Sequence, residues 1–272
     1  MVDAVHFISG LPRSGSTLLA ALLRQNPRFH SDITGPVALL CGVVHQRIGG
    51  TGEYSVLFDD ARCAQMLKGI FSSYYSHVPI GHVIFDTNRT WTNRAALLER
   101  LFPRSRTICC VRDIGWIIDS LERMRNKNPL KLSKLFPGQS GETLYTRVEY
   151  LMNSETGLIG AAWSGLREAW FSEAAQRLIV IPYDVLVADP AKTLKRIYEE
   201  IGEPYFEHDF NHVTYDAPEY DNNLGMPGLH TVHPVVEARE RLPCIPPDVF
   251  TKYAKTHFWA NRELNPRKVL IL

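Results

Sequence analysis

The residues best suited to chemistry by type and spacing lie at positions 10–17, in the sequence Gly-Leu-Pro-Arg-Ser-Gly-Ser-Thr. This segment follows a short apolar run at residues 5–9 and precedes leucines at helical spacing, which predicts a strand, a glycine turn and a helix. In such a turn, successive backbone N–H groups and the helix N-terminus can surround a phosphate. We therefore expect residues 10–17 to form an anion-binding loop.

The cation of this loop stands at an unusual position. In nucleotide triphosphatases the loop ends in Gly-Lys-Ser/Thr, because the lysine spans the β- and γ-phosphates. Here Ser16 occupies the place of that lysine, and the cation has moved forward to Arg13. A basic group at the fourth position of the loop lies closer to the bridging oxygen of a 5′-phosphosulfate than to a terminal γ-phosphate. The spacing therefore favours a phosphosulfate donor.

A second pair of residues is suited to bind another phosphate. Arg112 follows a predicted strand at residues 107–111, and Ser120 lies eight positions later, about two turns into the next helix. Open α/β sheets bind ligands outside the carboxyl ends of their strands. We expect Arg112 and Ser120 to converge on one phosphate at this edge.

Together these segments resemble the sulfotransferases that depend on 3′-phosphoadenosine 5′-phosphosulfate (PAPS). The run Pro-Arg-Ser-Gly-Ser-Thr-Leu-Leu from Pro12 is similar to the 5′-phosphosulfate loop of the tyrosylprotein and bacterial branches, and Arg112 with Ser120 has the form of the 3′-phosphate motif. The segment from Tyr183 resembles a Tyr-Glu-Asp-Leu segment whose tyrosine lies near the adenine. The resemblance implies that PAPS, and its product 3′,5′-adenosine bisphosphate (PAP), contact Arg13, Ser14, Gly15, Ser16, Thr17, Arg112, Ser120 and Tyr183.

The resemblance also suggests catalytic groups. Sulfuryl transfer should be an in-line displacement in which Arg13 stabilises the charge on the leaving oxygen. The family's second catalytic lysine is missing, because Asp86 to Arg89 stand in its place; Asp86 and Arg89 become candidates, with Arg89 supplying the cation. The glutamate base of the tyrosylprotein branch is also missing, and only Asp32 lies nearby. His230 is the candidate base or sulfate ligand, because histidine changes protonation near neutral pH.

The composition limits the possible partners. The 272 residues carry 30 Lys plus Arg against 29 Asp plus Glu, so the overall charge does not indicate binding to nucleic acid or to an acidic membrane. Five cysteines, none in a CxxC spacing, favour a reducing compartment. Because the first predicted strand begins at Val5, we expect no leader peptide. No apolar run reaches the length of a membrane helix, and we expect a cytoplasmic protein. We expect no metal, because the transferred group bears less charge than a γ-phosphoryl group. The two close histidine pairs, His230 with His233 and His208 with His212, lack a third ligand.

The elements that must position these residues alternate between strands and helices. Apolar runs at residues 83–85, 107–111 and 178–181 predict strands, and residues 36–48, 59–77, 141–170 and 192–201 predict helices. This order is typical of an α/β fold with a P-loop-like central parallel sheet and helices on both sides. We predict a single domain over residues 1–272, with helical insertions near 36–77 and 126–170 that wall the acceptor pocket, and an irregular loop at 205–234.

Two other functions fit parts of this pattern. In a P-loop kinase or nucleotidase that uses ATP and magnesium, Asp86 would be the aspartate that holds the metal. This sequence lacks the loop lysine that such enzymes require. The second alternative is a nucleotide-binding protein without catalysis, since the lysine and the glutamate that the family uses in catalysis are missing from this sequence. The favoured function is sulfuryl transfer from PAPS to a hydroxyl or amine of a small, partly apolar acceptor; neither the acceptor nor the oligomeric state can be read from the sequence.

Overall fold

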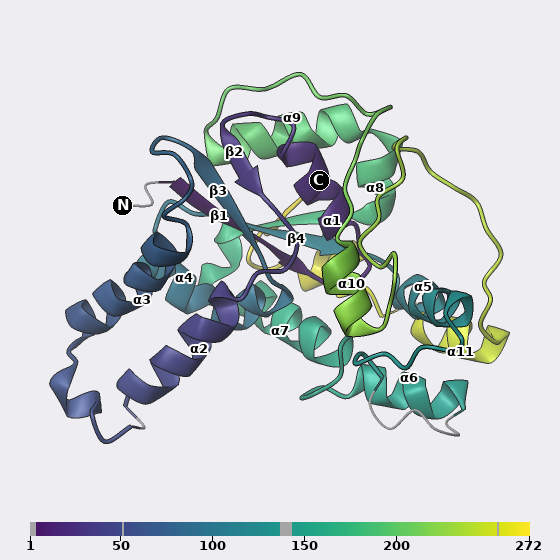
Figure 1. Ribbon diagram of the computed structural model, residues 1–272, viewed down its shortest axis with the longest axis horizontal. Coiled ribbons are helices and arrows are strands. Elements are labelled where there is room, and N and C mark those ends of the chain that lie inside the picture. Colours follow the sequence, from purple (N-terminus) through teal and green to yellow (C-terminus); the bar gives the residue numbers. More distant parts are fainter. Residues whose placement is uncertain (1–3, 51, 137–142, 255) are drawn as a thin grey trace.

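A central parallel sheet organises the computed structural model, which describes residues 4–50, 52–136, 143–254 and 256–272 (Figure 1). Within these residues the sheet has six strands in the order β2-β3-β1-β4-β5-β6, and all neighbours are parallel. The strands are β1 (Ala4–Gly10), β2 (Phe29–Ser31), β3 (Val83–Thr87), β4 (Thr107–Val111), β5 (Leu178–Pro182) and β6 (Leu270–Ile271). The α/β fold predicted from the sequence is confirmed.

Helices connect the strands and cover the sheet (Figure 1). The α-helices are α1 (Ser16–Leu23), α2 (Val37–Ile48), α3 (Asp60–Tyr74), α4 (Ala95–Leu101), α5 (Ile114–Lys127), α6 (Leu144–Met152), α7 (Gly160–Phe171), α8 (Tyr183–Ala188), α9 (Pro190–Ile201), α10 (Pro218–Leu224) and α11 (Pro247–Tyr253). Short 3₁₀ helices are η1 (Ser55–Leu57), η2 (Arg89–Arg94), η3 (Glu173–Arg177), η4 (Phe258–Ala260) and η5 (Arg262–Leu264).

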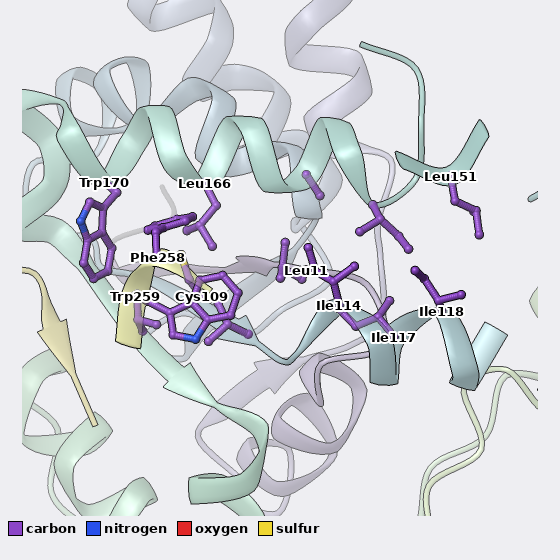
Figure 2. Packing of buried hydrophobic residues seen from close by; sticks show 14 of the residues in the cluster. Leu11, Cys109, Ile114, Ile117, Ile118, Leu151, Leu166, Trp170, Phe258 and Trp259 are labelled. Carbon is purple, nitrogen blue, oxygen red and sulfur yellow. The ribbon is translucent and has the colours of Figure 1, made fainter. Parts of the chain in front are cut away.

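The core lies on both faces of the sheet, because alternate residues of a strand point to opposite sides. In β4, Cys109 and Val111 pack in one cluster with α5 and α7, whereas Ile108 and Cys110 pack in another with α1 and α9. All five residues of β4 are buried, as expected for a strand covered on both faces. Figure 2 shows the first cluster, in which Ile114 of α5 lies beside Leu11, and Phe258 and Trp259 lie beside Cys109.

Two edge strands were not predicted. β2 has three residues and β6 has two, so neither is long enough to show a periodic pattern. Pairing with the existing sheet creates them: Phe29 lies opposite Val83 of β3, and Leu270 lies opposite Ile179 of β5.

The prediction of one helix over residues 141–170 is wrong. The structure has α6 and α7, separated by a turn in which Oδ1 of Asn153 accepts hydrogen bonds from the backbone N–H groups of Glu155 and Thr156. Asparagine favours such turns because its side chain competes with the helical hydrogen bonds. A side chain at Gly157 would place its Cβ 2.5 Å from the carbonyl oxygen of Leu151, so the tight turn requires glycine. Positions 141 and 142 lie outside the described residues.

Three further boundaries differ from the predictions. The helix predicted over residues 59–77 ends at Tyr74. The predicted polar turn after the second predicted strand begins later, because β3 continues to Thr87 and Asp86 is a buried strand residue. The irregular loop at residues 205–234 contains α10, with Pro218 in its first turn.

None of the described helices combines the length and apolar character of a membrane span. The domain and insertion boundaries stay predictions.

Candidate active site

The anion loop lies at the carboxyl edge of the sheet, between β1 and α1. Gly10 has φ 99°, and a Cβ there would lie 2.2 Å from the carbonyl oxygen of Cys110. Gly15 has φ 93°, and a Cβ there would lie 3.0 Å from the Tyr183 ring. Both positions therefore require glycine, because L side chains are strained at these angles and lack space. The predicted loop exists, and its second glycine lets Tyr183 approach the start of α1.

Within the loop, the residues predicted to bind the donor are arranged around the start of α1. Ser14 is buried and its Oγ donates to the carbonyl oxygen of Pro12 over 3.3 Å. Ser16 and Thr17 open α1, where backbone N–H groups have no helical partner. These groups can surround an anion, as the sequence predicted.

Arg13 connects the loop to two distant segments. Its Nε donates to Ser120 Oγ of α5 over 3.2 Å, and its Nη1 donates to the carbonyl oxygen of Leu229. Its backbone adopts φ 56°, in the left-handed region that non-glycine residues occupy at a cost. Burial, followed by the charge of Arg112, lowers the Arg13 pKa to about 10, so the guanidinium remains charged at neutral pH.

Arg112 lies beside the same loop. Its guanidinium is 4.0 Å from the centroid of the Tyr183 ring, a cation–π contact. Its Nε is buried and has no hydrogen-bond partner among the described residues. Burial lowers the Arg112 pKa, and Tyr183 opposes that shift. Because a buried donor without a partner is costly, this nitrogen is suited to a ligand anion.

His230 reaches the site from the segment after α10. Its Nδ1 lies 2.5 Å from Oδ1 of Asp221, and its backbone N–H donates to Oδ2 of the same carboxylate over 2.9 Å. Asp221 is fully buried, whereas the His230 side chain is 14% exposed. Burial lowers the His230 pKa, Asp221 raises it, and the charges of Arg13 and Arg89 lower it further. Arg13, Arg89 and His230 therefore lie close enough to interact electrostatically.

Asp86 is not brought into this group. Its Oδ2 accepts a hydrogen bond of 2.5 Å from the Tyr75 hydroxyl, and its Oδ1 accepts one of 2.7 Å from Nε1 of Trp91. Burial raises the pKa of Asp86, while these two hydrogen bonds lower it. The catalytic or metal-holding role considered for Asp86 is replaced by a structural one, because both oxygens already have partners in the core.

This structural role of Asp86 is testable. We expect Tyr75→Phe to lower the free energy of unfolding by about 1–2 kcal/mol, because it leaves Oδ2 of a buried carboxylate without its hydrogen bond. Urea denaturation measures the change. The neighbouring Tyr74→Phe is the control: Tyr74 is 40% exposed, and its loss of a hydroxyl should change stability by less than about 0.5 kcal/mol. Equal effects of the two substitutions would contradict the assignment.

Two residues of the site had not been singled out in the sequence. Asp221 is one; it stands in an irregular stretch with no motif around it. Arg241 is the other: its Nη2 lies 2.8 Å from Oδ2 of Asp119, its guanidinium lies over the Trp116 ring at 5.2 Å, and its charge lowers the Arg112 pKa. Its local sequence mixes Arg and Glu and is typical of a solvated segment, so the sequence carries no signal for this contact.

Two cavities lie among the described residues outside the loop. The smaller, about 280 Å³, borders Arg89. Its other lining residues come from η2, residues 134–135, α6, the turn after α6, and α7: Thr90, Asn93, Lys134, Leu135, Tyr150, Thr156, Gly157, Leu158, Ala161 and Ala162. The larger, about 1080 Å³, is a mostly apolar groove between α2 and α3, the two helices that project from the sheet in Figure 1. Both cavities are lined by segments predicted to wall an acceptor pocket.

The fold and the loop place the chain in the class of α/β proteins with a P-loop-like parallel sheet and an anion site after the first strand. Residues 6–207 match the model of the sulfotransferase family, which is well over half of the chain. The chain belongs to the sulfotransferase family, and the prediction of a sulfotransferase is confirmed over the kinase or nucleotidase alternative.

Solved structures agree with this fold. The sulfotransferase domain of the olefin synthase of Synechococcus PCC 7002 is 21% identical, with a TM-score of 0.52 and 95% of each chain covered. A sulfotransferase from Alicyclobacillus acidocaldarius is 12% identical, with a TM-score of 0.50, over 82% of this chain and 90% of that one. A search of the curated proteins finds no match.

Proposed function

We propose that this sulfotransferase takes its sulfuryl group from PAPS and transfers it to a hydroxyl or amine of a small, partly apolar acceptor. The observation that carries the choice of donor is the pair of arginines at neighbouring strand ends. Arg13 stands in the loop after β1, and Arg112 after β4 presents a buried Nε without a partner among the described residues. A donor with anions at both its 5′ and 3′ positions matches two separate cations.

The residues have distinct roles in this proposal. The amides of the loop, with Ser14, Gly15, Ser16 and Thr17, hold the 5′-phosphate. Arg112 and Ser120 bind the 3′-phosphate, and Tyr183 packs near the adenine. Because Ser120 accepts a hydrogen bond from Arg13, the two anion sites lie close together, and Ser120 must exchange this bond for the phosphate.

Chemistry in this arrangement rests on charge stabilisation. Arg13 stabilises the negative charge that develops on the oxygen between sulfur and the 5′-phosphate. Arg89, whose charge acts on His230, supplies a second cation in place of the missing family lysine. His230 accepts the proton of the acceptor. We expect no magnesium dependence, because these cations are permanently charged.

We place the acceptor in the smaller cavity, because Arg89 lines it and also interacts with His230. Leu135, Leu158 and Ala162 supply apolar surface there. The groove between α2 and α3 is larger, but none of its lining residues is among the loop, Arg112 or His230.

A cytoplasmic location also stays a prediction.

Ligand-dependent stability tests the donor. PAP at about 100 times its Kd should stabilise the fold by about 2.7 kcal/mol, seen as a rise in Tm. ATP with magnesium at the same concentration should have a smaller effect, because it offers no 3′-phosphate for Arg112. A larger shift with ATP and magnesium than with PAP would contradict the choice of donor.

Transfer distinguishes catalysis from binding alone. We would incubate the protein with [35S]PAPS and a mixture of phenols, alcohols and amines, and follow the label into products. Sulfated products establish the activity. PAP binding without label transfer or donor hydrolysis would favour a nucleotide-binding protein without catalysis.

A further inference from the structure

The buried carboxylate of Asp221 makes its side-chain hydrogen bonds with His230. Asp221 lies on α10 with its side chain fully buried, and both of its carboxylate oxygens face residue 230. Oδ2 accepts the backbone N–H of His230 over 2.9 Å, and Oδ1 lies 2.5 Å from Nδ1. Burying a carboxylate is costly unless it is hydrogen-bonded, so this contact must be made in the folded protein.

The contact determines where the imidazole carries its proton. An ionised carboxylate can only accept hydrogen bonds, so Nδ1 must be the protonated nitrogen. In the neutral imidazole, Nε2 then has the free lone pair. Because the backbone N–H of the same residue is also bound to Asp221, the ring is held in both its tautomer and its orientation.

The position of this pair relates it to sulfuryl transfer. Leu229, the residue before His230, accepts a hydrogen bond from Nη1 of Arg13 in the loop. The charge of Arg89, which lines the proposed acceptor cavity, also acts on His230 and lowers its pKa. His230 is therefore adjacent in the chain to a residue that binds the donor loop, and it lies within electrostatic range of an arginine that lines the cavity.

We propose that Asp221 is a positioning residue: it holds His230 with Nδ1 protonated, so that Nε2 accepts the proton of the acceptor hydroxyl. This inference rests on the proposed function. In the step, the acceptor oxygen forms a bond to sulfur as its proton passes to Nε2. The bond between sulfur and the bridging oxygen breaks, and its electron pair stays on the 5′-phosphate of PAP. The products are the sulfate ester, PAP and a protonated His230.

Asp221→Asn separates this role from simple packing. The asparagine has nearly the same shape, and its Oδ1 would still accept the backbone N–H of His230. Its amide group would then face Nδ1 as a donor, which requires Nδ1 to be unprotonated and moves the proton to Nε2. The variant should fold but hold the imidazole in the wrong tautomer.

The first measurement is 15N NMR of the imidazole nitrogens with saturating PAP, and it needs no acceptor. We expect the wild type to show Nε2 as the unprotonated nitrogen of His230, and Asp221→Asn to show Nδ1 instead; His230→Gln assigns the signals among the 10 histidines. Asp216→Asn is the matched control, because this exposed carboxylate just before α10 accepts a hydrogen bond from Thr231 and, among the described residues, has no hydrogen bond or ion pair with His230. The same tautomer in wild type and Asp221→Asn would overturn the proposal.

The second measurement is turnover with [35S]PAPS and 2-naphthol. Asp221→Asn should lower kcat about 10²- to 10⁴-fold, while the Kd for PAP changes less than about threefold. The groups facing the imidazole are Arg13, Arg89, Tyr220 and Asp221, and of these Asp221 raises its pKa. Its loss should therefore move the acidic limb of the kcat profile to lower pH.

The outcomes distinguish this inference from the proposed function. If PAP binds and wild-type turnover occurs, but Asp221→Asn keeps the wild-type rate and pH profile, the positioning role is wrong and the donor assignment stands. If PAP fails to stabilise the protein, the donor assignment is wrong, whatever the tautomer of His230.

Discussion

Replacing Arg13 by alanine should lower kcat for sulfuryl transfer about 10²- to 10³-fold, the largest catalytic loss we expect from a donor-site residue. The guanidinium lies in the loop after β1, where the oxygen that leaves sulfur gains negative charge. Because this charge is greatest in the transition state, the interaction accelerates the reaction more than it strengthens binding. Initial rates at saturating [35S]PAPS measure kcat, and PAP titration should show a Kd within about threefold of wild type.

The control for this prediction keeps the charge. Arg13→Lys retains a cation but loses the planar guanidinium, whose Nε and Nη1 donate to Ser120 and Leu229. The kcat of Arg13→Lys should therefore lie between those of wild type and Arg13→Ala. Urea denaturation of both variants checks that the loop still folds, since Arg13 occupies φ 56°. A kcat of Arg13→Ala within about threefold of wild type would exclude the leaving-group role.

Replacing Arg112 by alanine should weaken PAP binding about 10- to 100-fold, which corresponds to the loss of about 1.5–3 kcal/mol from charge-assisted hydrogen bonds. Its buried Nε has no partner among the described residues, so the ligand phosphate supplies the missing acceptor. kcat at saturating PAPS should fall less than about threefold, because the charge of the 3′-phosphate does not change during sulfuryl transfer and Arg112 therefore binds it equally in the ground state and the transition state. Isothermal titration with PAP and initial-rate kinetics measure the two quantities.

A matched variant controls for the loss of charge. Arg104 is exposed and precedes β4 at its amino end, whereas Arg112 follows the carboxyl end. Arg104→Ala removes the same charge from the opposite edge of the sheet and should leave the Kd for PAP unchanged within about twofold. Similar Kd values for the two variants would show that Arg112 acts through overall charge and makes no direct contact.

Much of the fold could be predicted because its signals are local. The strands at residues 107–111 and 178–181 are continuous apolar runs, and the structure has them as β4 and β5. The loop between Gly10 and Gly15 could be recognised because its glycines, its arginine and its flanking strand and helix are adjacent in the chain. β2 and β6 could not be predicted, because their two or three residues become strands only by pairing with the existing sheet.

The candidate site was predicted in part. Arg13, Arg112, Ser120 and Tyr183 are brought to one edge of the sheet. Asp86 was assigned to a turn because the predicted strand ended at residue 85, two residues before the end of β3 at Thr87. No local pattern reveals that the Tyr75 hydroxyl and the Trp91 indole donate hydrogen bonds to its carboxylate. The roles of the predicted residues in binding and catalysis stay predictions that the variants above test.

The sequence by itself determined the parallel α/β sheet, the anion loop and the two strand-end arginines, because hydrophobic periodicity and glycine turns act over a few residues. Only the tertiary structure decided which groups surround them. Arg13 contacts Leu229, 216 positions away, and the buried carboxylate of Asp221 on α10 contacts His230 in the segment that follows this helix. Such contacts depend on how packing closes long loops over the sheet edge, and that information is not contained in any short stretch of residues.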